Sequence, residues 1–191
     1  MLDDVQDTTA LHRSESELQA GLDEVRAAPR TAGRLDMVVR RPAVDEREVL
    51  AEGELSVEIG LVGDTWDVRP SKDMADGSPS PLRQLTVMNS RAAALFAVSA
   101  DRWPLCGDQL YVDLDISQAN LPAGSRLLIG EAIIEISEPP HLGCAKFTQR
   151  FGLDAMRLVN SDEGKAMRLR GANAVVVTPG TIRQGDPVTV L

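Results

Sequence analysis

The sequence contains little cysteine and few aromatic residues, and it has no long hydrophobic run. Its two cysteines, Cys106 and Cys144, are too few for a disulfide framework. Aromatic residues make up only 3% of the chain, so the core must be aliphatic. No apolar run approaches the roughly 18 residues of a membrane-spanning helix. The acidic, polar first residues do not resemble a signal peptide, so we expect a cytoplasmic protein with reduced thiols.

Charge is unevenly distributed along the chain. The net charge is -9, yet residues 1–64 contribute -8 (7 basic and 15 acidic side chains), whereas residues 139–191 contribute +3 (7 basic and 4 acidic). Binding to nucleic acid needs a broad positive field, which an acidic protein lacks, so we expect no nucleic-acid partner. The basic C-terminal third suits a small anion, although an ordinary solvated surface would have the same composition.

The N-terminal segment carries a helix signal. Ser14 and Glu17 form an S-x-x-E capping box, and Leu18, Leu22 and Val25 follow at helical spacing. These features predict an amphipathic helix over residues 14–28 that packs on the outside of a domain. We therefore divide the chain into a flexible N-terminus with a helix (residues 1–33) and a single domain (residues 34–191).

The rest of the chain reads as many short strands separated by glycine and proline turns. Gly130-Glu131 joins two apolar runs in a compact hairpin pattern, and residues 110–116 alternate between apolar and polar side chains. A helix capped by Ser90 is expected over 91–98, and a long polar loop over 69–82 is typical of a functional or mobile segment. This pattern predicts a mainly β fold with a few short helices (α+β), arranged as a barrel or a strongly bent sheet.

Residues 139–147, PPHLGCAKF, combine a thiol, an imidazole and a lysine. Cys144 directly precedes an expected helical turn, with His141 before it and Lys146 and Arg150 after it. Cations and a helix N-terminus favour the thiolate, which is the reactive form of cysteine. Buried free cysteine is also common and inert, so the residues alone leave both interpretations open. Cys106 is expected to fill a core gap, with oxidative pairing to Cys144 as the alternative.

Arginine is the second candidate feature, because its planar guanidinium matches the geometry of a phosphate group. A small anion site can be assembled from four cations of the C-terminal third, although a solvated surface remains the competing interpretation. These four are Lys146, Arg150, Arg168 and Arg170. The sequence contains no phosphate-cradling glycine loop, no zinc-ligand spacing and no nucleophilic-serine elbow.

Four segments together resemble a MOSC domain, the module named after the C-terminus of molybdenum-cofactor sulfurases. They are GLVGDTW (60–66), CGDQLYVDLDIS (106–117), NLPAGSRLLIGEAIIEISEPPHLGCAKFTQRFG (120–152) and RLRGANAVVVTPGTIRQGD (168–186). The resemblance covers roughly residues 34–191 and leaves out the N-terminal helix. It implies a MOSC-type β-barrel and a stand-alone protein without the aminotransferase-like domain of cofactor sulfurases.

The resemblance also implies roles for particular residues. Cys144 would coordinate molybdenum or carry sulfur as a persulfide, and His141 would act beside it as a base or hydrogen-bonding group. Asn89 and Arg91 occupy a strand-to-helix junction that resembles one placed near the same pocket, although capping by Ser90 explains this junction equally well. Together with Lys146 and the arginines, these residues would bind molybdopterin, whose phosphate suits basic side chains.

Three functions follow from these observations. The first is a molybdenum-cofactor-dependent oxidoreductase or sulfur-transfer protein that acts on a small molecule, with an electron- or sulfur-donating protein as partner. The second is a non-catalytic carrier of a phosphorylated, pterin-like ligand, in which the arginines matter and Cys144 does not. The third is a structural adaptor that uses the acidic helix over 14–28.

Overall fold

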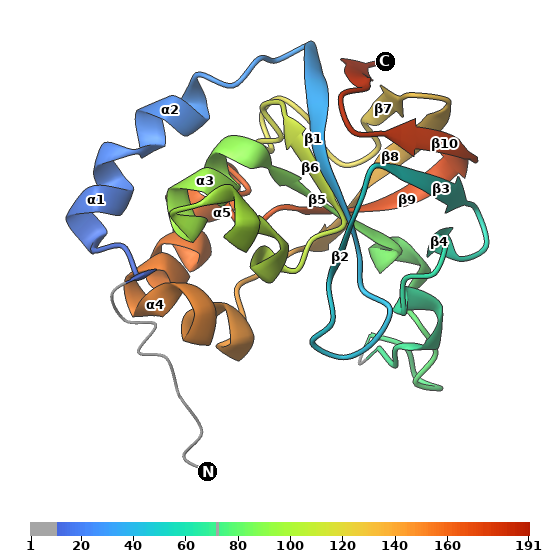
Figure 1. Ribbon diagram of the computed structural model, residues 1–191, viewed down its shortest axis with the longest axis horizontal. Coiled ribbons are helices and arrows are strands. Elements are labelled where there is room, and N and C mark those ends of the chain that lie inside the picture. Colours follow the sequence, from blue (N-terminus) through green and yellow to red (C-terminus); the bar gives the residue numbers. More distant parts are fainter. Residues whose placement is uncertain (1–10, 72) are drawn as a thin grey trace.

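A closed barrel of seven strands forms the centre of the computed structural model, which describes residues 11–71 and 73–191 (Figure 1). The barrel strands are β1 (Ala32–Arg40), β5 (Leu85–Asn89), β6 (Leu110–Asp113), β7 (Arg126–Ile129), β8 (Ala132–Pro140), β9 (Ala172–Thr178) and β11 (Pro187–Val190). Their order is β11-β7-β8-β9-β5-β6-β1, and β1 pairs again with β11 to close the ring. The predicted mainly β, barrel-like fold is confirmed.

Smaller elements extend this barrel. β2 (Glu48–Leu50) pairs with the end of β1, and a separate three-stranded sheet has the order β10-β3-β4. Its strands are β3 (Glu52–Ser56), β4 (Gly60–Leu61) and β10 (Gly180–Arg183). The expected hairpin at Gly130-Glu131 is present as β7 and β8, which pair in antiparallel register from Ile129–Ala132 outward. β5 and β6 pair in parallel, and the helix that separates them lies outside the barrel.

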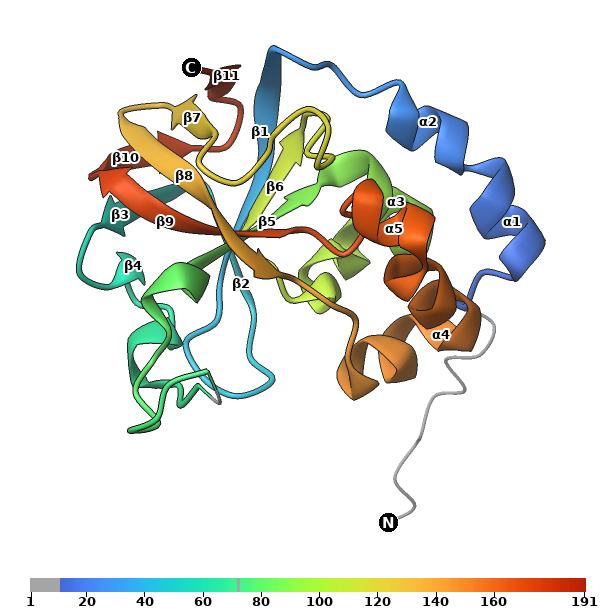
Figure 2. The same ribbon diagram turned by 180° about the vertical axis from the view of Figure 1, so that it is seen from behind.

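Five helices gather on one side of the barrel, opposite the small sheet, as both ribbon views show (Figures 1 and 2). They are α1 (Glu15–Ala20), α2 (Leu22–Arg26), α3 (Ser90–Ala97), α4 (Ala145–Asn160) and α5 (Asp162–Ala166). In the described part of the chain, 3-10 helices lie in the connections at Trp66–Val68, Pro81–Arg83 and Ala100–Cys106.

Two hydrophobic cores divide the residue types between them. The apolar side chains of the first core, in the barrel, are all Leu, Val, Ile or Ala, as expected for an aliphatic core. The second core, between helices and barrel, contains most of the aromatic rings. Phe147 packs 5.5 Å from Phe96 and 4.9 Å from Phe151, measured between ring centroids. Buried aromatic rings contribute a large apolar area, so this cluster fixes the first turn of α4, directly after Cys144.

The N-terminal segment differs in detail from its prediction. The capping box is present, because Ser14 accepts from the Glu17 amide and the Glu17 carboxylate accepts from the Ser14 amide. Leu18, Leu22 and Val25 are buried. The helix is interrupted at Gly21, where a β-carbon would clash with Leu95, and so forms α1 and α2. Residues 1–10 of the expected flexible terminus lie outside the described residues, and the domain boundary at 33/34 stays a prediction.

Two further sequence-based assignments need correction. Asn89, not Ser90, is the N-cap of α3, because its side chain accepts from the amides of Arg91 and Ala92, whereas the Ser90 hydroxyl donates to Asp36. β6 ends at Asp113, although alternating residues continue to 116. Gly152 interrupts α4 with φ 90° and ψ 169°, so two helical segments meet there at a kink.

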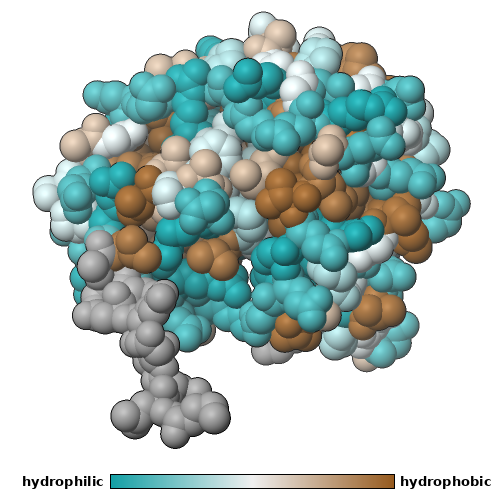
Figure 3. Space-filling view, in the orientation of Figure 1, coloured by the Kyte–Doolittle hydropathy of each residue, from teal (hydrophilic) through white to brown (hydrophobic). Residues whose placement is uncertain are grey.

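The molecular surface in the view of Figure 1 is mostly hydrophilic, with separate hydrophobic patches among the polar side chains (Figure 3). Among the residues that the structure describes, no helix has the length and apolar character needed to cross a membrane.

Candidate functional site

Cys144 is exposed and occupies the N-cap position of α4, so the expected helix start behind the thiol is confirmed. Its side chain makes no capping hydrogen bond. The loop before it is held down by Gly143, whose amide donates to Oδ1 of Asn160 at 3.0 Å. A β-carbon at Gly143 would lie 2.6 Å from Sδ of Met156, so only glycine allows the loop to run this close to α4. The result is a fixed backbone that presents a free thiol.

A buried polar cluster lies beneath the same loop. Nδ1 of His141 is 3.3 Å from Oδ1 of Asp108, and the other oxygen of Asp108 accepts from Arg170 at 2.6 Å. Arg170 also donates to the carbonyl of Cys106 at 2.8 Å. The Asp108 and Arg170 side chains are 0% and 7% exposed, so the ion pair is shielded from water. The loop that presents Cys144 therefore starts at His141, which belongs to a buried cluster with Asp108 and Arg170.

Burial determines the protonation of this cluster. It lowers the pKa of His141 well below the usual range, and the nearby cations Arg170, Arg41 and Arg83 lower it further. Burial also raises the pKa of Asp108, while the guanidinium of Arg170 favours the ionised carboxylate. His141 is thus neutral at physiological pH and keeps one nitrogen free to accept a proton.

A pocket of about 350 Å³ opens beside His141. We call it the arginine pocket, because Arg41, Arg69 and Arg83 line it together with His141 and Asn173. Three guanidinium groups face one hollow that contains a single carboxylate, from Asp73, so the pocket suits an anionic ligand.

Two of these arginines are held in place by the protein itself. Arg41 donates from Nε and Nη2 to the two oxygens of Asp64, both at 2.8 Å, and this pair is buried. Arg83 donates to the carbonyl of Pro140 at 3.0 Å and pairs with Asp73. The bond to Pro140 ties the pocket wall to the residue before His141.

His141 also lines a smaller hollow of about 110 Å³, so the two spaces share this residue. Arg168 and Arg170 line this hollow together with Leu142. Arg168 is partly buried and donates to the carbonyls of Ile116 and Leu121, so much of its hydrogen-bonding capacity is used within the fold.

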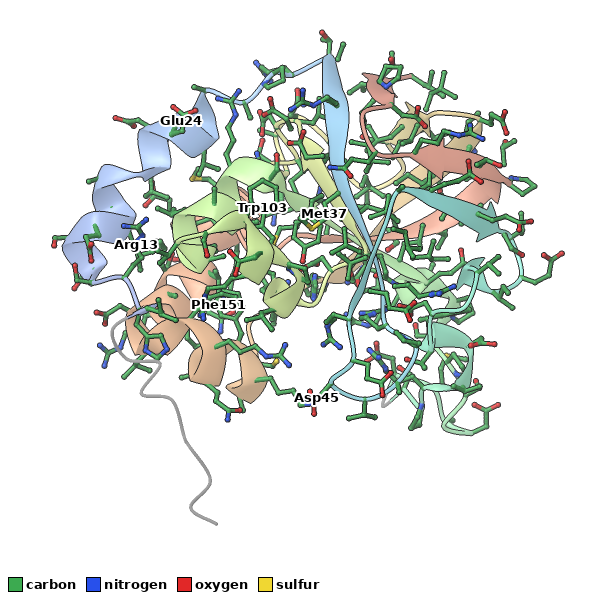
Figure 4. The ribbon with its side chains drawn as sticks, viewed as in Figure 1. Arg13, Glu24, Met37, Asp45, Trp103 and Phe151 are labelled. Carbon is green, nitrogen blue, oxygen red and sulfur yellow. The ribbon has the colours of Figure 1, made fainter. Side chains whose placement is uncertain are left out.

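Lys146 and Arg150 meet in a third hollow, of about 340 Å³, on the far side of Cys144 along the chain. Asp45 reaches this hollow from the loop between β1 and β2 (Figure 4). Its Oδ1 lies 2.6 Å from Nζ of Lys146 and 3.2 Å from Nη2 of Arg150. The structure thus brings these two predicted cations together, and places one of the protein's own carboxylates between them.

The structure places Asn89 and Arg91 apart from these hollows. Asn89 is buried, caps α3 and donates to the carbonyl of Leu114 at 2.9 Å. Arg91 pairs with Asp113 at 2.7 Å and with Glu24 at 3.1 Å. Neither residue lines the two hollows that share His141.

The sequence-based prediction missed the residues that build the arginine pocket and its buried support. Arg69 and Arg83 lie at the two ends of the long polar loop, and the length of this loop was the sequence signal that could have pointed to them. Asp64 does accept from the amide of Trp66 at 3.0 Å, as a turn aspartate should, but it also binds Arg41. Asp108 follows Gly107 in a Gly-Asp pair that is typical of a turn, and only the folded chain places it against Arg170 and His141.

Several solved structures share this fold. The YuaD protein from Bacillus subtilis is 16% identical and has a TM-score of 0.59, with 83% of this chain and 95% of that one covered. YiiM from Escherichia coli is 21% identical with a TM-score of 0.54, covering 83% and 69%. YiiM from Geobacillus stearothermophilus is 13% identical with a TM-score of 0.51, covering 86% and 74%. At these identities the likeness concerns the fold. No curated protein matches the sequence.

The family model for the MOSC domain matches residues 86–189, which is more than half of the 191 residues. The match includes the barrel strands from β6 to β9, Asp108, the loop with His141 and Cys144, and Arg170. The expected resemblance is therefore confirmed, and the chain belongs to the MOSC domain family.

Proposed function

We propose that this protein binds molybdenum cofactor, or carries sulfur as a persulfide, through the thiol of Cys144. The observation that carries the proposal is the position of this thiol. It is exposed on a fixed loop, three residues after His141, which lines the arginine pocket. Three residues of chain span at most about 11 Å, so the Cα atoms of His141 and Cys144 lie within that distance of each other.

The side chains present fit such a cofactor. A thiolate is a soft ligand that suits molybdenum. Within residues 11–71 and 73–191, no three His, Cys, Asp or Glu side chains converge on a metal position, so a cofactor would bring most of the metal's other ligands. The phosphate of molybdopterin matches the guanidinium groups of Arg41, Arg69 and Arg83. When bound, the cofactor would supply a redox-active metal for the reduction or oxidation of a small molecule.

The persulfide version uses the same sulfur without a metal. The Cys144 thiolate attacks the terminal sulfur of a donor persulfide, R–S–SH. A new sulfur–sulfur bond forms on Cys144, the donor's sulfur–sulfur bond breaks, and the donor leaves as the thiolate R–S⁻. The exposure of Cys144 meets the access that this exchange requires. A sulfur-donating protein, or an electron-donating protein in the molybdenum version, would be the partner.

Metal analysis tests the molybdenum version. The protein is isolated from a host that produces molybdenum cofactor, and molybdenum per chain is measured for the wild type and for Cys144→Ser. The control is Ala145→Ser, which introduces a hydroxyl at the next exposed position. We expect at least a tenfold loss of molybdenum in Cys144→Ser and none in the control. Equal metal content in all three proteins would exclude coordination by Cys144.

Intact mass tests the persulfide version. After incubation with a low-molecular-weight persulfide and removal of the excess, the wild type should gain the mass of one sulfur atom, and Cys144→Ser should gain none. A wild type that gains no sulfur would contradict this version.

The arginine pocket also supports a second function, the non-catalytic carrier of a phosphorylated ligand. In that case Arg69→Ala and Arg83→Ala would abolish cofactor binding, while Cys144→Ser would retain it. Loss of binding in all three variants would instead favour a cofactor that is bound both by the arginines, at its phosphate, and by Cys144.

A further inference from the structure

His141 and Asp108 form a buried contact that goes beyond the binding of a ligand by Cys144. We propose that Asp108 is a positioning residue that holds His141 with its proton on Nδ1, so that Nε2 is left as a proton acceptor toward a ligand in the two hollows. The state of the histidine follows from the fold alone. The use of Nε2 by a ligand rests on the proposed function.

The first argument is the hydrogen-bonding requirement of the two facing atoms. Nδ1 of His141 and Oδ1 of Asp108 are both fully buried and lie 3.3 Å apart, and neither atom has a hydrogen-bonding partner of good geometry among the described residues. Buried polar atoms without partners are costly. A proton on Nδ1 places a donor opposite the acceptor Oδ1, whereas a proton on Nε2 would leave two lone pairs facing each other across 3.3 Å.

The second argument is that Asp108 is held in the acceptor role. Its Oδ2 accepts from Nη1 of Arg170 at 2.6 Å, and Arg170 is fixed in turn by the carbonyl of Cys106. The ring of Phe147 packs against the same guanidinium, 5.3 Å from its carbon to the ring centroid. A guanidinium only donates, so Oδ2 stays an acceptor. The adjacent cation favours the ionised carboxylate against the effect of burial, and an ionised Oδ1 requires a donor.

The third argument is the space reserved for the contact. Gly171 has φ 102°, and a β-carbon on it would lie 3.1 Å from Oδ1 of Asp108, 3.3 Å from Nδ1 of His141 and 2.7 Å from the carbonyl oxygen of Val87. A side chain at 171 would therefore press on both facing atoms. The glycine lets them approach without an intervening group.

The fourth argument is the direction of the remaining ring edge. The His141 side chain is 17% exposed while its Nδ1 is fully buried, so the exposed part belongs to the rest of the ring. His141 lines both the arginine pocket and the smaller hollow, and the exposed part of the ring is the part that a ligand there could contact.

The charged groups around the ring keep it neutral. Arg170 belongs to the cluster itself, and Arg41 and Arg83 approach from other elements. Asp108 is the facing carboxylate, while Tyr111 and Cys106 lie near the same ion pair as neutral groups, because burial raises the pKa of both. Three cations against one adjacent carboxylate disfavour a second proton on His141, so Nε2 remains bare.

Nitrogen NMR tests the inference directly, because the chain has only His12 and His141. The protein is labelled with ¹⁵N-histidine, and His12→Gln assigns the two sets of signals. We expect His141 to be the Nδ1–H tautomer at pH 7 in the protein without ligand. In Asp108→Asn the amide can donate to Nδ1, so the proton should move to Nε2. His12 in the same samples is the control.

Two results would overturn the inference: an Nε2–H tautomer in the wild type, or an unchanged Nδ1–H tautomer in a folded Asp108→Asn. The wild-type spectrum alone decides the first point, so the test survives if the variant does not fold. The tautomer is measured without cofactor, and metal content does not enter it. Failure of the proposed function and failure of this inference are therefore separate observations.

Discussion

Nδ1 of His141 lies 3.3 Å from Oδ1 of Asp108. His141 itself stands three residues before Cys144, whose thiol is exposed. Asp108 precedes β6, His141 follows β8, and Cys144 begins α4, so the contact joins three parts of the fold. A buried ion pair, a neutral imidazole and a free thiol thus occupy one end of the barrel beside a pocket lined by arginines. Each of these features can be tested separately.

The two thiols should differ sharply in accessibility. Cys144 is exposed, whereas Cys106 is 3% exposed and packs in the core between helices and barrel. We expect one thiol per chain to react within minutes with DTNB, a thiol-reactive disulfide, and the second only in denaturant. Peptide mass spectrometry after alkylation should identify the fast thiol as Cys144. Fast reaction of both thiols in the native protein would contradict the assigned burial.

Removal of the Asp64 carboxylate should destabilise the fold. The Asp64–Arg41 pair is buried, and its loss leaves an uncompensated guanidinium that also lines the arginine pocket. Asp64→Asn should lower the free energy of unfolding by about 3 kcal/mol or more in urea titrations. Asp154→Asn, which removes a surface carboxylate paired with Arg157, should change it by less than about 1 kcal/mol. Equal effects of the two substitutions would argue against a structural role for Asp64.

Two glycines allow backbone strain to be separated from close packing. Gly171 and Gly185 have φ of 102° and 96°, but only a β-carbon at 171 meets other atoms within 4 Å. Gly185→Ala should cost about 1 kcal/mol from strain alone. Gly171→Ala should cost roughly 2 kcal/mol more, because the new methyl group meets Val87 and the His141–Asp108 contact. Thermal or urea unfolding measures both, and similar costs would show that the space at 171 is not restricted.

Acid should destabilise the protein through His141. Its folded pKa is well below its unfolded value of about 6.5, so the unfolded chain binds more protons as the pH falls through 6.5. Stability is then retained above about pH 6.5 and decreases below it, by up to roughly 1.4 kcal/mol per pH unit.

His141→Asn is the comparison for this pH dependence, since its amide can still donate toward Asp108 but does not titrate. Burial raises the pKa of Asp108, which acts in the opposite direction in both proteins. Urea titrations between pH 5 and 7.5 should show a steeper loss in the wild type. Parallel curves would mean that His141 is protonated in the folded protein.

Asp45 should restrain the reactivity of Cys144 toward anions. It pairs with Lys146 and Arg150, the cations that follow Cys144 in the first turns of α4. DTNB is an anion, so Asp45→Asn should speed its reaction with Cys144 by about two- to fivefold at low salt, and less in 0.5 M salt. Glu46→Gln makes the same change in net charge at the next exposed residue. Equal acceleration in both variants would point to net charge rather than to Asp45.

Much of the barrel could be predicted from the sequence, because local signals match local structure. The hairpin around Gly130, the alternation that begins at residue 110 and the capping box at Ser14 each depend on neighbouring residues, and each is present. The strand over residues 110–113 is shorter than the alternating pattern, which continues to residue 116. Asp115 and the residues after it turn away into a loop, in which the side-chain amide of Asn120 donates a hydrogen bond to the carbonyl of Asp115. Alternation shows which side chains are buried, but the barrel's register decides where pairing stops.

The candidate site could be predicted only in part. Cys144, His141, Lys146 and Arg150 are close in sequence, so their grouping was visible. Arg41 follows β1, whereas Arg69 and Arg83 lie at the two ends of the long polar loop, and charge alone does not show which arginines converge. Aspartates in Gly-Asp pairs are ordinary turn residues. Contacts such as Arg41–Asp64 and Arg170–Asp108, which are 23 and 62 residues apart, are set by barrel closure.

Protection of Cys144 from alkylation is the most direct test of the central claim that its sulfur holds the ligand. Protein from a cofactor-producing host is alkylated in the native state, before and after the metal is released, and Cys144 is quantified by peptide mass spectrometry. In the molybdenum version, the unmodified fraction of Cys144 should match the molybdenum bound per chain, and Cys144 should become fully modified after the metal is released. In the persulfide version, Cys144 should carry one additional sulfur and become fully modified as a thiol after reduction. Equal, complete alkylation of an unsulfurated Cys144 in metal-loaded and metal-free protein would contradict the account.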